Sequence, residues 1–206
     1  MKYLYHYMKD LIKKILKEET EGVLVIPGLH YFPDGVEGLK NFIKKNNITR
    51  WSLDGDLDLG GYKGDLTWLE GLVSISGDFD AYGTEIKSFK NLISVDGYLN
   101  LYNSQIESLG NLQSVGDYLN LEETPIESFG NLRTVGASLD LNKTPIKSLG
   151  NLQSVGGYLD IRGTQIESFG NLKSVRLRLY LNSYLSTKTN EEIKSMVDVG
   201  GLIVRL

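Results

Sequence analysis

The sequence predicts an α/β repeat solenoid in which stacked coils of 20 residues form one parallel β-sheet. Three observations predict it. The chain matches itself when it is shifted by 20 residues, apolar residues recur at fixed positions of that period, and each repeat holds one Leu-x-Leu pair. A fixed short period over more than half of a chain is typical of solenoids, because each coil can bury its apolar side only against its neighbours.

Five consecutive segments align without a gap, and a sixth, which begins at Phe169, starts in register and then departs. The five segments read LEGLVSISGDFDAYGTEIKS from Leu69, FKNLISVDGYLNLYNSQIES from Phe89, LGNLQSVGDYLNLEETPIES from Leu109, FGNLRTVGASLDLNKTPIKS from Phe129 and LGNLQSVGGYLDIRGTQIES from Leu149.

The Leu-x-Leu pair marks a short strand, since alternate side chains of a strand point to opposite faces. We therefore expect strands near 78–82, 98–102, 118–122, 138–142 and 158–162, with Leu119 and Leu121 buried. Glycines such as Gly116 and Gly136 precede the strands, where a tight turn or a close approach of coils favours glycine. A hydroxyl column follows each strand and should bond backbone groups of the turn. Its members are Thr84, Ser104, Thr124, Thr144 and Thr164.

The ends of a solenoid need covering, and the sequence suggests a cap at each end. Residues 1–50 are predicted to form an N-terminal α/β capping module, 51–185 the solenoid and 186–206 a C-terminal cap. The first module should contain an amphipathic helix within 1–20, a strand at 23–26 and a second helix from Val36 to about Asn46. In the C-terminal cap, Thr189 or Asn190 should begin a helix that ends at Gly200-Gly201, before a last strand at 202–206.

The repeated pattern Val-x-x-x-Leu-x-Leu-x-x-Thr-x-Ile resembles the Leu-x-x-Leu-x-Leu-x-x-Asn-x-Leu of leucine-rich repeats, in the short length class of bacterial and bacteriophage proteins. The resemblance covers roughly 51–185 and implies the solenoid fold, whereas the family's functions are too varied to transfer. Thr or Ser stands in the usual Asn position, and the segment from Leu109 is too short and too rich in Gly and Ser for a regular convex helix. Small members of the family include effectors and inhibitors that bind host proteins, which implies a host-directed binder.

Charge and composition narrow the classes of function. The net charge is −4; residues 1–50 carry +3 (nine basic minus six acidic) and residues 51–206 carry −7 (13 basic minus 20 acidic). Acidic repeats disfavour nucleic acid, whose binding depends on Lys and Arg at phosphates. The chain has no cysteine and no apolar run near the ~20 residues of a membrane span. We expect a protein of a reducing compartment, the cytoplasm.

No catalytic signature stands out in the sequence. The two histidines, His6 and His30, lie in the N-terminal module, and no phosphate-binding loop, His-Glu-x-x-His helix or Gly-x-Ser-x-Gly elbow occurs. We expect neither an enzyme nor a site for a metal or cofactor.

The outward positions of the predicted strands form three columns that combine tyrosine with Asp and Asn. Three interpretations compete: solvated strand positions, a paired-carboxylate hydrolase, and a recognition surface. Asp140 and Asp160 should lie one strand apart and repel each other. Tyrosine favours recognition, because it buries a large rigid area at low entropic cost. The candidate protein-binding residues are Asp78, Asp80, Tyr82, Tyr98, Asn100, Tyr102, Tyr118, Asn120, Glu122, Asp140, Tyr158, Asp160, Arg162 and Tyr180.

The sequence thus predicts a protein–protein interaction module whose partner carries a basic surface. The alternative is a structural or oligomeric repeat protein that docks on a membrane or a partner through its N-terminal basic helix, with Lys13, Lys14 and Lys17. A third hypothesis is nucleic-acid binding through the same lysines. The sequence leaves the oligomeric state open.

Overall fold

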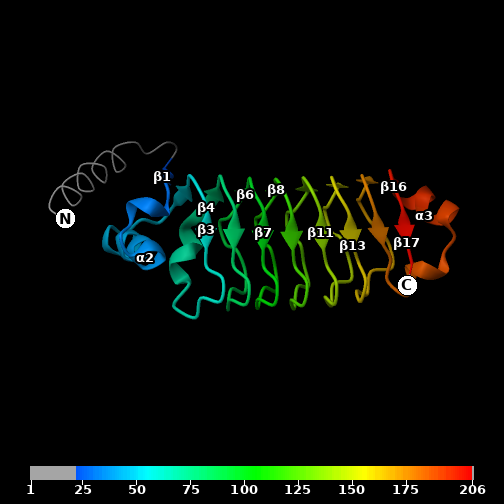
Figure 1. Ribbon diagram of the computed structural model, residues 1–206, viewed down its shortest axis with the longest axis horizontal. Coiled ribbons are helices and arrows are strands. Elements are labelled where there is room, and N and C mark those ends of the chain that lie inside the picture. The colour runs from blue at the N-terminus through cyan, green and yellow to red at the C-terminus, as the bar shows by residue number, and fades with distance from the viewer. Residues whose placement is uncertain (1–21, 206) are drawn as a thin grey trace.

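The protein is an elongated stack of coils, most of which contribute one short strand to each of two parallel β-sheets (Figure 1). The structure is a computed structural model that describes residues 22–205. The eight-stranded sheet is the row of large arrows facing the viewer in Figure 1, and the nine-stranded sheet runs along the top.

Each sheet takes its strands in chain order along the stack. The nine-stranded sheet consists of β1 (Leu24–Ile26), β2 (Trp51–Leu53), β4 (Leu72–Ile75), β6 (Ser94–Val95), β8 (Ser114–Val115), β10 (Thr134–Val135), β12 (Ser154–Val155), β14 (Ser174–Val175) and β16 (Asp198–Val199). The eight-stranded sheet consists of β3 (Leu57–Asp58), β5 (Phe79–Asp80), β7 (Leu99–Asn100), β9 (Leu119–Asn120), β11 (Leu139–Asp140), β13 (Leu159–Asp160), β15 (Leu179–Tyr180) and β17 (Ile203–Val204).

The predicted parallel solenoid of 20-residue coils is confirmed, but it holds two sheets where the sequence predicted one. Leu99 pairs in parallel with Leu119, and Leu119 with Leu139, so one repeat is one coil. The second sheet comes from the Ser-Val or Thr-Val pair of each repeat, for example Ser114 beside Thr134. The Ser-Val or Thr-Val pair holds one apolar residue and lacks the Leu-x-Leu alternation that predicted the strands of the other sheet.

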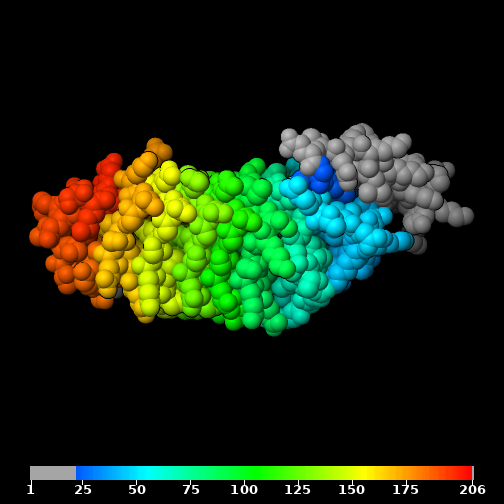
Figure 2. All heavy atoms as spheres, turned by 180° about the vertical axis from the view of Figure 1, so that it is seen from behind, coloured from blue at the N-terminus to red at the C-terminus, as the bar shows by residue number. Residues whose placement is uncertain are grey.

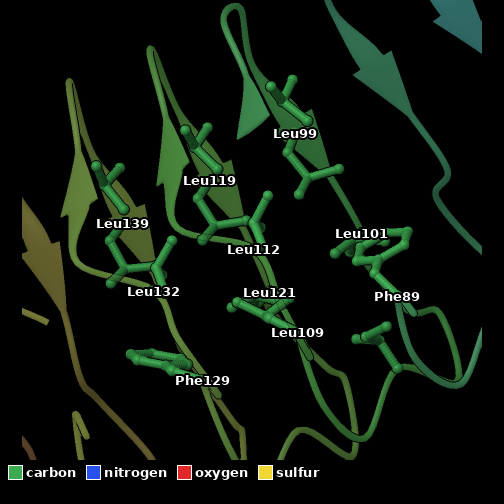
Figure 3. Packing of buried hydrophobic residues seen from close by; sticks show 14 of the residues in the cluster. Phe89, Leu99, Leu101, Leu109, Leu112, Leu119, Leu121, Phe129, Leu132 and Leu139 are labelled. Carbon is green, nitrogen blue, oxygen red and sulfur yellow. The ribbon is translucent and has the colours of Figure 1, made fainter. Parts of the chain in front are cut away.

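Ladders of like side chains fill the interior of the stack (Figure 3). Leu119 and Leu121 are both 0% exposed, as predicted. Figure 2, from the side opposite to that of Figure 1, shows the coils following one another in chain order. Each coil therefore buries its apolar residues chiefly against its two neighbours, which is the packing that a 20-residue period requires.

Glycine at the corner before the strands of the central coils allows these coils to approach closely, as the sequence predicted. A Cβ atom on Gly136 would lie 2.0 Å from the carbonyl oxygen of Gly116, and one on Gly156 would lie 2.0 Å from that of Gly136. Backbone therefore packs on backbone between these glycines, where a Cβ atom would overlap the preceding coil.

The first described elements are β1, the short helix η1 (Leu29–Tyr31) and the helix α2 (Gly35–Lys45), close to the predicted bounds. After β3, the short helix η2 (Thr67–Gly71) leads into β4, and its Trp68 stacks on Trp51 with ring centroids 5.6 Å apart. The helix predicted within residues 1–20 lies outside the described residues.

The last coil contains the short helix η3 (Leu185–Thr187) and the helix α3 (Asn190–Met196), followed by β16 and β17. Thr189 caps α3 as predicted: its hydroxyl accepts the Glu192 N–H, and the Glu192 carboxylate accepts the Thr189 N–H. The helix ends before the predicted Gly200-Gly201, because Asp198–Val199 joins the nine-stranded sheet. Arg205 stands where the earlier coils have the second residue of the Leu-x-Leu pair. Its guanidinium donates to Asn190 Oδ1 and to the Lys188 carbonyl.

Candidate functional site

The outward residues of the eight-stranded sheet form one surface, here called the tyrosine face. Its middle column runs in register from Asp80 through Asn100 and Asn120 to Asp140 and Asp160. The flanking columns are formed by the residue before each strand and the residue two positions after the middle one. All fourteen predicted site residues lie in these columns, and all are exposed or half-buried except Asp160, which is 2% exposed.

The middle column has a structural role that the sequence reasoning missed. The Oδ1 atom of each of its Asp and Asn residues accepts the backbone N–H two positions later. The acceptors are Asp80, Asn100, Asn120, Asp140 and Asp160, with distances of 3.1, 3.2, 3.0, 2.9 and 3.0 Å. These are Asx turns, which bend the chain after each strand. The signal was present in the sequence, because Asp and Asn share this bonding and alternate freely in the column.

The first column also bonds the backbone, but between coils. Asp78 Oδ1 accepts the Tyr98 N–H at 2.9 Å, and Ser138 Oγ accepts the Tyr158 N–H at 3.0 Å. Asp56 bonds the Asp78 N–H in the same way at 2.8 Å. Acidic side chains of the face therefore hold neighbouring coils together while they present charge to solvent.

Three tyrosines form an aromatic cluster toward the C-terminal half of the face. The ring centroids of Tyr118 and Tyr158 lie 6.2 Å apart, although one whole coil, that of Ser138, lies between them. Tyr158 meets Tyr180 edge-on at 6.0 Å, and the Arg162 guanidinium lies 5.1 Å from the Tyr180 ring centroid. Tilted and edge-on contacts at these distances are favourable, so the cluster is held in place before any partner arrives.

Asp160 and Asp140 lie in adjacent strands, as predicted, yet their environments differ. Arg162 Nε donates to both carboxylate oxygens of Asp160 at 2.9 Å, which neutralises this buried group. Burial raises the pKa of Asp140, and the charges of Asp160 and Glu122 raise it further, against the N–H of Asn142 and the charge of Arg162. The predicted repulsion between the two carboxylates therefore raises the pKa of Asp140, which lacks an arginine partner of its own among the described residues.

Burial also raises the pKa of Tyr118, whose hydroxyl lies 3.5 Å from Asp140 Oδ2. The phenol therefore stays protonated and can serve as a donor beside the carboxylate. Together Tyr118 and Asp140 form a half-buried donor and acceptor at the centre of the face.

Charge is divided unevenly along the tyrosine face. Asp56, Asp58, Asp78 and Asp80 lie on its first coils, and within residues 22–205 none of them forms an ion pair. Burial raises the pKa of Tyr98, and these four carboxylates raise it further. At the other end, Arg178, in the first column, is exposed. The face is thus acidic at its N-terminal end and basic at its C-terminal end.

The hydroxyl column beneath the face bonds the backbone as predicted at its four threonines, whereas the buried Ser104 hydroxyl has no hydrogen-bond partner among the described residues. The hydroxyls of Thr84, Thr124, Thr144 and Thr164 each donate to the carbonyl three residues earlier, at 2.6–2.8 Å. Beyond Thr164, the buried Asn182 of the next coil donates to the Thr164 hydroxyl at 3.3 Å and to the Ile166 carbonyl at 2.6 Å.

The described residues hold no other clear centre of chemistry. Between residues 22 and 205, no three His, Asp or Glu residues lie close enough to share a metal ion. His30 packs on the ring of Tyr31, whereas His6, Lys13, Lys14 and Lys17 lie outside the described residues. A groove runs along the nine-stranded sheet past Thr134, Ser154 and Ser174, away from the predicted site. In the same part of the chain, no helix is long and apolar enough to cross a bilayer.

Comparison of the chain with protein-family models, with curated proteins and with solved structures finds no match.

Proposed function

We propose that this protein is a binding module, not an enzyme, and that it recognises another protein through the tyrosine face. The observation that carries the proposal is the tyrosine cluster, which is pre-ordered by its own ring contacts and shares the face with Asp78 and Asp80, carboxylates that form no ion pair with the described residues. Rigid aromatic residues dominate the energy of protein interfaces, because they bury much area and lose little side-chain entropy on binding.

The acidic end of the face favours a partner with a basic surface. Asp78 and Asp80 each use Oδ1 for a backbone N–H, and their Oδ2 atoms accept no backbone N–H. Complementary charge speeds encounter and selects the partner more than it raises affinity. The same backbone bonds argue against a hydrolase, because a catalytic acid and base need a free proton path and a pocket around the substrate.

The leucine-rich-repeat pattern extends the proposal. Threonine hydroxyls bond the turn from the position that Asn occupies in that pattern. We place the chain with short leucine-rich-repeat proteins of the bacterial or bacteriophage kind, acting in the cytoplasm as an effector or inhibitor of a host protein.

The test is affinity capture with purified face variants. Tyr118 and Asp140, the central positions, also carry ring packing and an Asx turn, so their replacement would disturb stability. Tyr82→Ala combined with Asp80→Asn is cleaner, since Tyr82 is 47% exposed and asparagine keeps the turn acceptor. Tyr184→Ala, at a 50% exposed tyrosine outside the face, is the matched control.

We expect a protein that wild type and Tyr184→Ala retain to bind the face variant at least ~10-fold more weakly, in line with the ~1–2 kcal/mol typical of interface anchors. Equal retention by all three forms in quantitative binding would exclude the acidic end of the tyrosine face as part of the site and would overturn a partner with a basic surface there.

A further inference from the structure

When the order of the strands along the stack is reversed, the charges of the tyrosine face become complementary to those of the original order. In the eight-stranded sheet, β5 is the second strand from one end and β15 is the second strand from the other end. Reversal of the stack brings Asp78, before β5, opposite Arg178, before β15. It also brings Asn100 opposite Asp160 and Asn120 opposite Asp140.

The outer columns match in the same way. Tyr98 comes opposite Tyr158, a pair that can stack, and Tyr102 comes opposite Arg162, a cation–π pairing. Glu122 comes opposite Asn142. In the three columns, over the described residues, reversal places no two groups of like charge opposite each other.

We propose that the tyrosine face binds a second copy of this chain, with the two sheets face to face and the two stacks running in opposite directions. The two-fold axis lies between β9 and β11, parallel to the strands. Such an interface is self-complementary, because each contact of one residue with another occurs twice. The inference rests on the proposed function and names its partner: the basic surface is the Arg178 end of the second copy.

The charge pattern of the tyrosine face favours this dimer over the other two-fold dimer in which the same faces meet. If both stacks ran in the same direction, every strand would oppose its own copy, and the middle column would oppose itself. Asp58, Asp80 and Asp140 would then each face the same residue of the second copy. Like charges directly opposite are destabilising, so this packing is disfavoured.

The size of the face sets the expected affinity. Eight strands at ~4.8 Å spacing and five residues at ~3.3 Å give a flat area of roughly 630 Å² per copy. Stable interfaces bury ~800 Å² per partner, so we expect a weak, reversible dimer with a Kd in the micromolar range.

The decisive experiment uses two charge-reversed chains, Asp78→Lys and Arg178→Glu, studied by sedimentation velocity over a range of concentrations. Each variant alone places like charges opposite each other twice and should dimerise at least ~10-fold more weakly than wild type. An equimolar mixture restores both opposite-charge pairs in a heterodimer, and dimerisation should return. Asp78→Lys also loses the acceptor for the Tyr98 N–H, so its melting temperature is measured in parallel. If that variant does not fold, Asp78→Asn, which keeps the acceptor, replaces it and should weaken the dimer alone.

A second measurement uses the fact that the chain has no cysteine. Asn142→Cys lies next to the two-fold axis, about one strand spacing (~4.8 Å) along the stack from its copy. A short bis-maleimide should therefore link two such chains. Ser168→Cys, exposed and outside the tyrosine face, is the control and should link few.

The outcomes separate the inference from the proposed function. A chain that stays monomeric at high micromolar concentration, or charge-reversed variants that dimerise as wild type does, would overturn the inference. If a foreign protein is still captured in a manner that depends on Tyr82 and Asp80, the proposed function stands with another partner. If neither dimer nor face-dependent capture is found, both fail.

Discussion

Leu121→Ala tests the inward column of the solenoid. Leu121 is 0% exposed and stands in the ladder between Leu101 and Leu141, as Figure 3 shows in part. The substitution removes three carbon atoms, worth ~2.4 kcal/mol of transfer free energy at ~0.8 kcal/mol each. Backbone hydrogen bonds to the coils on both sides hold the walls apart, so a cavity should remain. We therefore expect a loss of ~3–4 kcal/mol in the free energy of unfolding, within the ~2–5 kcal/mol range for such changes.

The assay is urea denaturation followed by far-UV circular dichroism and by tryptophan fluorescence. Circular dichroism reports the whole stack, whereas the stacked Trp51 and Trp68 report its N-terminal end. Glu122→Gln is the control: the next residue points outward, and glutamine can still accept from Asn142 Nδ2, so stability should change by less than ~0.5 kcal/mol. A loss below ~1 kcal/mol at Leu121, or equal losses at both positions, would refute the assignment of inward and outward sides.

Two further predictions concern the corner and the face. Gly136→Ala brings a Cβ to 2.0 Å from the Gly116 carbonyl oxygen, and this overpacking should cost ~1–3 kcal/mol in the same urea assay; unchanged stability would show that the coils can separate there. Asp140→Asn keeps the acceptor for the Asn142 N–H but removes a half-buried charge. Because the folded pKa of Asp140 is raised, the native state holds its proton more tightly than the unfolded state does below that pKa. The stability that this proton provides is present below the unfolded pKa of ~3.9 and is lost as the pH rises through the folded value. The stability of Asp140→Asn relative to wild type should therefore increase between about pH 4 and pH 7, and a difference independent of pH would contradict the raised pKa.

The fold could be predicted to the level of the coil, because every coil repeats the same packing problem. Leu119 and Leu121 had to point inward once the 20-residue period was recognised, and the structure buries both. The strand at Ser114–Val115 was not predicted, because it lacks the Leu-x-Leu alternation that marks the other sheet and its pairing depends on the coils on either side.

For the face, the sequence predicted which residues share a surface but not how they bond to each other. The strand register follows from the period, so Asp140 had to neighbour Asp160. The ion pair of Arg162 and the contact between the rings of Tyr118 and Tyr158 depend on side-chain rotamers, which the aligned repeats do not specify.

The sequence by itself determined the length of a coil, the apolar columns that fill the stack, and the side of the strand on which each polar residue lies. Period and polarity suffice for these, since burial of apolar side chains is the dominant driving force and has no direction. Only the tertiary structure decided that the coil has two sheet faces and that the Asp and Asn column makes Asx turns. It also decided that charge runs from acidic to basic along the tyrosine face. These features depend on hydrogen bonds and charges, whose strength changes with distance, direction and burial, and the folded backbone sets all three.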